Sequence, residues 1–112
     1  MSIKLADYKF QGPYTSTAEL KDRPGIYAIH CNYKNQYTLI DIGESAQVKS
    51  RVDNHERMKC WLKNCQGIIT VSVYYTKHWT QEGRFQFQQK LRKLYNPPCG
   101  KKSDSVLNFI ND

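Results

Sequence analysis

The sequence predicts an α+β fold in which helices flank a small, three-stranded and mainly antiparallel sheet, in the order β-β-α-β-α. Two β-prone runs, 25–32 and 37–42, lie close together with a polar turn between them. A third run, 67–76, alternates apolar and polar residues, which is the pattern of a half-buried strand. Two stretches with helical periodicity, 45–63 and 80–95, follow the second and the third strand.

The first two runs are typical of a hairpin. Pro24-Gly25 precedes the first run, the segment from Asn32 to Gln36 is polar, and the second run stops at Gly43. We therefore expect an antiparallel pair of strands joined by a loop of about five residues.

Capping signals support the two long helices. Ser45 is a good N-cap for the first helix, whose inner stripe holds Val48, Val52, His55 and Leu62. Thr80 opens the second helix, and Pro97-Pro98 must stop it because proline cannot continue a helix.

The two ends of the chain carry weaker signals. The first 23 residues are mixed and polar with a turn at Gly12-Pro13, and Ser16-x-x-Glu19 matches the capping box of a short helix over 16–21. A last short helix is expected over 103–110.

Length and charge bound the class of protein. With 112 residues, we expect a single domain over 1–112, and a formal net charge of +7 favours a polyanionic partner such as DNA. No stretch approaches about 18 apolar residues, so we expect neither a transmembrane helix nor membrane binding. No apolar signal segment follows Met1, so a cytoplasmic location is the expectation. The oligomeric state is left open.

The four cysteines have two interpretations. In a cytoplasmic chain they are expected to be reduced thiols rather than a disulfide framework. The spacing of Cys60 and Cys65 leaves a zinc site as the alternative, although no second pair has ligand spacing.

Asp41 is unusual because it interrupts an apolar strand just before Gly43. A carboxylate at such a position is either exposed or held by a cation, and Arg51 is a candidate for that cation. Arg51 and His55 share one side of the predicted helix. With Tyr27 from the first strand, they form either a functional cluster or ordinary packing and surface residues.

The ordered set of motifs resembles the GIY-YIG nuclease family. Gly25-Ile26-Tyr27 matches the first motif, and Asp41-Ile42-Gly43 occupies the second. Arg51 stands at the family's spacing of ten residues after the second motif begins, and His55 follows one turn later. The resemblance covers about 23–100. The segments Asp41–Ser45, Arg51–His55, Cys60-Trp61 and Tyr95–Gly100 look like a small bacterial branch with Asp in the second motif.

One position departs from the family's pattern. The family's metal-binding Glu lies about nine residues before a proline, and counting back from Pro97 gives Gln88. A Gln offers only a neutral carbonyl to a hard cation such as Mg²⁺. Either Gln88 is natural and the metal site is impaired or rebuilt, or it is an engineered change. Glu82 cannot replace it, because it points about 120° away on a helix.

The resemblance implies a DNA endonuclease that hydrolyses phosphodiesters with one divalent ion, Mg²⁺ or Mn²⁺. In it, Tyr27 would help to deprotonate water, Arg51 would stabilise phosphate charge, and His55 would assist proton transfer. Asp41 would orient Arg51 or a metal-bound water. The expected DNA contacts are Lys49, Lys59, Arg84, Lys101 and Lys102. The alternatives are an inactive nucleic-acid-binding module and a small basic interaction protein.

Overall fold

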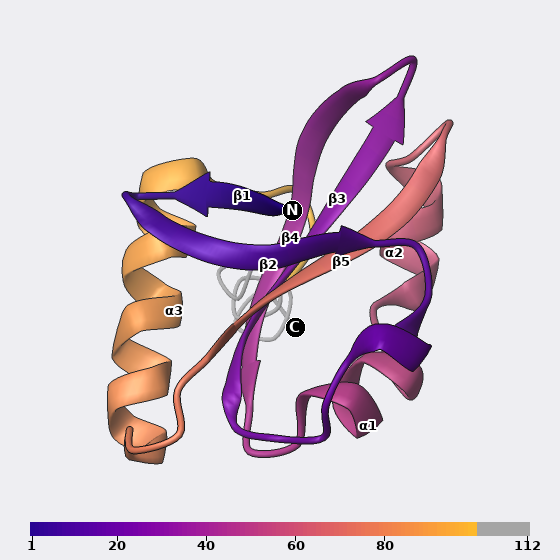
Figure 1. Cartoon of the computed structure of the whole chain (residues 1–112). Coiled ribbons are helices and arrows are strands. Elements are labelled where there is room, and N and C mark those ends of the chain that lie inside the picture. The colour runs from indigo at the N-terminus through magenta and orange to yellow at the C-terminus, as the bar shows by residue number, and fades with distance from the viewer. Residues whose placement is uncertain (101–112) are drawn as a thin grey trace, which may run out of the picture.

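A computed structural model describes residues 1–100 as a five-stranded antiparallel sheet with helices on both faces (Figure 1). The strand order is β1-β2-β5-β3-β4, so β4 is an edge strand. The strands are β1 (Ser2–Leu5), β2 (Tyr8–Tyr14), β3 (Gly25–Tyr33), β4 (Gln36–Ser45) and β5 (Ile68–Tyr75). The helices are the 3₁₀ turn η1 (Thr17–Glu19), α1 (Val48–Asp53), α2 (Met58–Lys63) and α3 (Gln81–Tyr95).

The predictions of a three-stranded sheet and of the element order β-β-α-β-α are wrong, because 2–14 form a hairpin that adds β1 and β2 to the sheet. Ile3, Leu5, Tyr8 and Phe10 supply the alternation of a pair of strands. The sequence pattern does not predict this hairpin, because its two-residue turn, Ala6-Asp7, lacks the Asn-Gly or Asp-Gly signature. Both turn residues nevertheless have positive φ, 49° and 68°.

The strands at 25–32 and 37–42 form the expected hairpin, with different bounds. The loop contains two residues rather than five, because Lys34 and Asn35 adopt the positive φ values of a tight turn, 53° and 66°. The second strand continues past Gly43 to Ser45.

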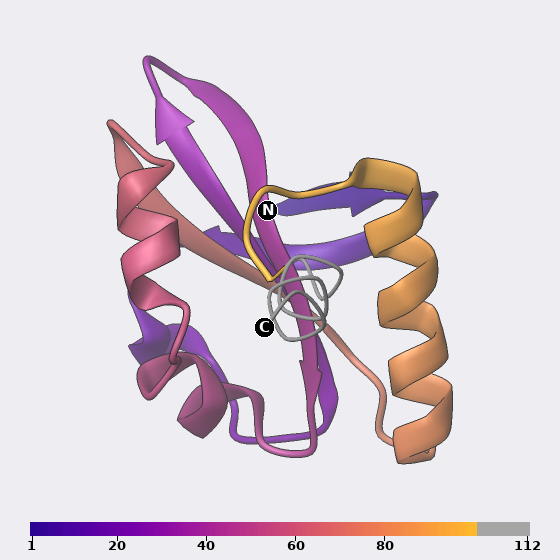
Figure 2. The ribbon, with the colours of Figure 1, turned by 180° about the vertical axis from the view of Figure 1, so that it is seen from behind.

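The two faces of the sheet carry separate apolar clusters. On one face, α1 and α2 pack with Tyr27 and Ile29 of β3; on the other, α3 packs with Ile26 and Ala28. Figure 2 shows the two groups of helices on opposite sides of the strands. A bulge in β4 places Asp41 opposite Ile29 and Gly43 opposite Tyr27, so both residues belong to the α1–α2 face.

The prediction of one helix over 45–63 is wrong, because the chain forms two short helices, α1 and α2. The break lies at 54–57, where side chains add hydrogen bonds to the backbone. The Asn54 side chain donates to the carbonyl of Ser50, and the Arg57 N–H donates to His55 Nδ1. The break turns His55 toward the sheet.

The other predicted helices have different outcomes. The helix expected over 80–95 is confirmed as α3, with Thr80 as its N-cap and a left-handed Asn96 at its end. The capping box at Ser16 gives only the 3₁₀ turn η1, although Ser16 does accept a hydrogen bond from the Ala18 N–H. The helix expected over 103–110 lies outside the described residues. No helix within 1–100 is long and apolar enough to cross a membrane.

The expectation of reduced cysteines is wrong, and so is the zinc alternative. Cys31 bonds to Cys65, and Cys60 bonds to Cys99. The prediction of reduced thiols depended on reducing conditions, and the zinc alternative combined Cys60 with its near neighbour Cys65. In the structure, each of these two cysteines faces a partner from another element, Cys31 of β3 or Cys99 beyond α3.

Candidate functional site

The site begins with Tyr27, whose ring lies over Gly43. The two residues are direct partners across β3 and β4. A Cβ atom at Gly43 would overlap the Oη, Cζ and Cε1 atoms of Tyr27, so the glycine makes the space that the phenol occupies. This contact gives a physical reason for a tyrosine in the first motif and a glycine in the second.

His55 holds the phenol from the other side. Its Nε2 lies 2.6 Å from Tyr27 Oη, while its Nδ1 accepts the Arg57 N–H at 3.1 Å. Because Nδ1 accepts, the proton of the neutral ring belongs on Nε2, which donates to Tyr27. The hydrogen of the Tyr27 hydroxyl is therefore left to donate to another acceptor.

Arg51 and Glu56 form the outer edge of this cluster. The guanidinium of Arg51 donates two hydrogen bonds to the Glu56 carboxylate, at 2.5 and 2.7 Å. This contact raises the pKa of Arg51, and Tyr27 acts in the same direction. The Arg51 contact also lowers the pKa of Glu56 to about 2. The side chain of Glu56 is 63% exposed, whereas that of Arg51 is 31% exposed.

Burial decides the protonation of the inner pair. Tyr27 is 1% exposed and His55 is 6% exposed. Burial raises the pKa of Tyr27 to about 12 and lowers the pKa of His55 to about 4. The positive charges of Arg57 and Arg51 oppose the first shift and add to the second. At neutral pH the pair is a phenol and a neutral imidazole.

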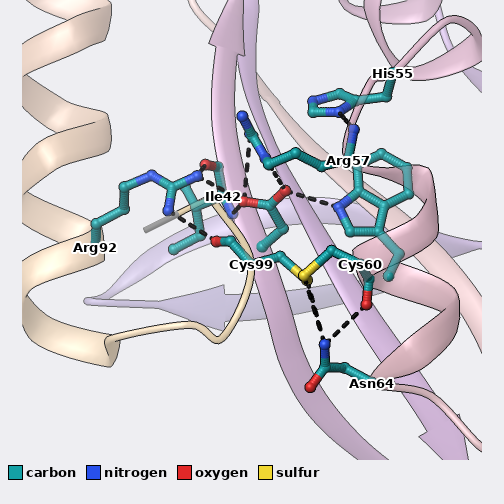
Figure 3. The surroundings of a disulfide bond; sticks show 9 residues. Ile42, His55, Arg57, Cys60, Asn64, Arg92 and Cys99 are labelled. Atoms are coloured by element: carbon teal, nitrogen blue, oxygen red, sulfur yellow. Dashed lines mark hydrogen bonds and ion pairs between the residues drawn. A yellow bond between two sulfur atoms is a disulfide. The ribbon is translucent and has the colours of Figure 1, made fainter. Parts of the chain in front are cut away.

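Figure 3 shows Arg57 and Arg92 in a neighbouring network. These two arginines, and not Arg51, are the cations that pair with the buried Asp41. Its carboxylate accepts from Arg57 Nε at 2.7 Å and from Arg92 Nη2 at 2.6 Å. The indole of Trp61 donates to it at 2.7 Å, and so does the Ile42 N–H at 2.8 Å. Arg51 could not be its partner because the helix break directs Arg51 to Glu56 instead.

Gln88 lies on the face of α3 that points to β4. It stands one turn after Arg84, which donates to Glu44 at 2.9 Å, and one turn before Arg92. Its amide donates to the Oε1 atom of Gln89 at 3.3 Å. Within residues 1–100, no hydrogen bond joins Gln88 to Tyr27 or His55.

The residues present do not fit the divalent ion that the resemblance implies. The carboxylates of Asp41, Glu44 and Glu56 are each in an ion pair with arginine. In the part of the chain that the structure describes, no group of three His, Cys, Asp or Glu residues is placed to hold a metal ion.

The residues expected to contact DNA differ in their surroundings. Lys59 is exposed, and Lys49 pairs with Asp53 at 3.1 Å on the surface of α1. Arg84 is buried and paired with Glu44. Lys101 and Lys102 lie outside the described residues.

Sequence reasoning missed Glu56 and Arg57. Glu56 is five residues after Arg51, a separation that does not place two side chains together on a continuous helix. Only the break between α1 and α2 brings them together. The polar tripeptide at the break, Asp53-Asn54-His55, is the one signal that could have indicated an interruption.

No family model, curated protein or solved structure matches this chain. The resemblance to the GIY-YIG nucleases therefore depends on the sequence motifs alone and stays a prediction.

The contact between Tyr27 and Gly43 predicts the effect of a single methyl group. Gly43→Ala should lower the free energy of unfolding by about 1–3 kcal/mol, because the added atom displaces a buried ring. The measurement is urea denaturation. Gly83→Ala is the control: its Cβ would lie 3.4 Å from Thr80 Oγ1, and it should be neutral or slightly stabilising. Equal stability of Gly43→Ala and the original sequence would contradict the packing described.

Because two histidines are buried, we expect the free energy of unfolding to decrease as the pH is lowered. Burial lowers the pKa of both His30 and His55 to about 4, whereas an unfolded histidine titrates near 6.5. Between these values the unfolded chain binds more protons, so the free energy of unfolding should fall from pH 7 to pH 4.5, by up to about 1.4 kcal/mol per pH unit for each histidine.

Denaturant titrations across this range measure that slope. His55→Gln should remove about half of it, and His78→Gln, at an exposed position, should leave it unchanged. A slope independent of position 55 would show that His55 accepts a proton in the folded protein as readily as in the unfolded chain.

Proposed function

We propose that this chain binds phosphodiester groups of DNA at the cluster of Tyr27, Arg51 and His55, on an endonuclease-type site whose hydrolysis is weak or absent. The single observation that carries the proposal is that the Arg51 guanidinium interacts with Tyr27 on one side and with the exposed carboxylate of Glu56 on the other. The Tyr27 hydroxyl receives a hydrogen bond from His55, which leaves its own hydrogen available. The planar guanidinium of Arg51 supplies the matching fork for phosphate oxygens.

Glu56 supports an anion at this position. Its carboxylate accepts two hydrogen bonds from Arg51, with the geometry that a phosphate would use. Because Glu56 is largely exposed, water can solvate its carboxylate once it leaves Arg51, and a phosphate can then accept the same two hydrogen bonds. A phosphodiester can therefore replace Glu56 without disturbing the buried Tyr27–His55 pair.

Gln88 is the reason to expect binding without efficient cleavage. Metal-assisted hydrolysis needs fixed negative charge at the cation, and Gln88 stands where the resemblance implies a glutamate. An active endonuclease remains the alternative, since the phenol and the imidazole are held as a proton-transfer pair requires. Cleavage assays separate the two.

Replacing Arg51 and Glu56 should change DNA affinity in opposite directions. Arg51→Ala removes a charge-assisted contact and should weaken binding of a short duplex about 10- to 100-fold. Glu56→Gln removes the competing carboxylate and should tighten binding about 3- to 10-fold. Fluorescence anisotropy with a labelled duplex measures both.

Glu82→Gln is the matched control, because it makes the same charge change at an exposed position on α3. If Glu82→Gln tightens binding as much as Glu56→Gln, only net charge matters and Glu56 does not compete with phosphate. Unchanged binding by Arg51→Ala would exclude the proposed site.

Restoring a carboxylate at position 88 should restore cleavage. We expect the present sequence to cut plasmid DNA weakly or not at all in Mg²⁺ or Mn²⁺, and Gln88→Glu to cut faster by orders of magnitude. Arg51→Ala in that background should abolish the gain. Gln89→Glu is the control for added charge. If the present sequence cuts as well as Gln88→Glu, position 88 is not the metal ligand.

A further inference from the structure

A second basic feature lies outside the helices. A groove of about 480 Å³ is lined by residues from three parts of the chain: Gln11, Lys21, Arg23, Pro24, Tyr75 and Lys77. Three of these residues are cations, and none is a carboxylate. A groove of this size and composition suits a phosphate-bearing ligand.

The cations of this groove are not engaged elsewhere in the described chain. All five arginines of the sequence lie within 1–100, and Arg51, Arg57, Arg84 and Arg92 each pair with a carboxylate. Arg23 has no ion pair among the described residues, and neither have Lys21 and Lys77. The nearest acid in the sequence, Asp22, accepts from the N–H and the hydroxyl of Ser50.

The backbone beneath these side chains is firmly held. The carbonyl of Arg23 accepts the Val48 N–H at 3.1 Å, and that of Pro24 accepts the Thr76 N–H at 2.9 Å. The Lys21 N–H donates to the Tyr75 hydroxyl at 2.8 Å, which leaves the hydroxyl hydrogen to donate elsewhere. The side chains of Lys21, Arg23 and Lys77 therefore extend from a backbone held by hydrogen bonds, and the Tyr75 hydroxyl adds a further donor beside them.

The groove lies near the Tyr27 cluster. Tyr75 pairs with Gly25, and two residues further along the same strands Val73 pairs with Tyr27. Two residues of a strand span about 7 Å, so the groove and the cluster are neighbours along β3. Successive phosphates of a DNA strand are separated by a comparable length, with a rise of about 3.4 Å along the helix axis.

We propose that this groove binds phosphates of the DNA strand that flank the phosphodiester at Arg51. The inference depends on the proposed function and adds to it the path of the strand. The path leads from α1 across the segment 21–24 to the end of β5, instead of along the exposed faces of α2 and α3.

The decisive variant replaces Lys21, Arg23 and Lys77 together with glutamine. We expect duplex affinity at 0.1 M salt to fall about 10- to 100-fold. The slope of log affinity against log salt should become shallower by about 2–3, since each lost phosphate contact contributes about 0.7–0.9. The control replaces Lys4, Lys9 and Lys34 with glutamine, three exposed lysines at the β1–β2 and β3–β4 hairpins, and should keep the slope within one contact of the original.

Each failure has a distinct outcome. If the original sequence does not bind DNA, both proposals are wrong. If it binds, Arg51→Ala weakens binding, and the groove variant behaves like the control, the groove inference alone is wrong. A competition experiment forms the third arm of the test, with inorganic phosphate and oligonucleotides of increasing length as the competitors. We expect affinity to rise with length, whereas competition by millimolar phosphate as strong as that of a long oligonucleotide would identify a small-anion site instead. Thermal melts of both variants establish that they fold.

Discussion

The buried carboxylate of Asp41 is the constraint on which the rest of the structure depends. It is 0% exposed and accepts from the side chains of Arg57, Trp61 and Arg92. These donors belong to the chain before α2, to α2 itself and to α3, so a single charge joins both faces of the sheet across the edge strand β4. Arg92 also donates to the carbonyls of Ile42 and Cys99. Removing one donor would leave a buried charge with incomplete compensation, which is far more costly than losing a surface pair.

The bulge in β4 connects this network to the candidate site. Ile40 packs in the cluster beneath α1 and α2, whereas Ile42 packs beneath α3, although two residues of a regular strand share one face. The extra residue at the bulge shifts the alternation, so Asp41 and Gly43 face α1 and α2 together. The same irregularity therefore directs the carboxylate toward its arginines and opens the space for the Tyr27 ring. The network around Asp41 and the candidate site at Tyr27 therefore depend on one local distortion.

Local signals in the sequence predicted the elements whose formation is local. Thr80 and Pro97-Pro98 delimit α3 correctly, and the alternation around Val71 and Val73 identifies β5. The sequence predicted neither the hairpin of β1 and β2 nor the division of the helix at 54–57. The hairpin depends on an unusual turn, and the division of the helix depends on the contact of His55 with Tyr27 of β3. The sequence could not identify the partner of Asp41 for the same reason. Arg51 and Arg57 are equally plausible partners in the sequence, and only the break determines which of them faces the sheet.

The distribution of ion pairs changes what the net charge of +7 means. In the sequence Arg84, Arg92 and Lys59 look equivalent, and each could neutralise a phosphate. In the structure Arg84 is buried against Glu44, and Arg92, which is 15% exposed, pairs with the buried Asp41, so both arginines serve the fold. A polyanion is attracted by charge that is both exposed and uncompensated, and this charge gathers where few carboxylates lie. Arg51 is intermediate, because its partner Glu56 is exposed and replaceable. In the proposed binding of DNA, affinity would therefore depend on which carboxylates can leave their arginines. Among the carboxylates paired with arginine in residues 1–100, Glu56 is the one whose exposure permits it.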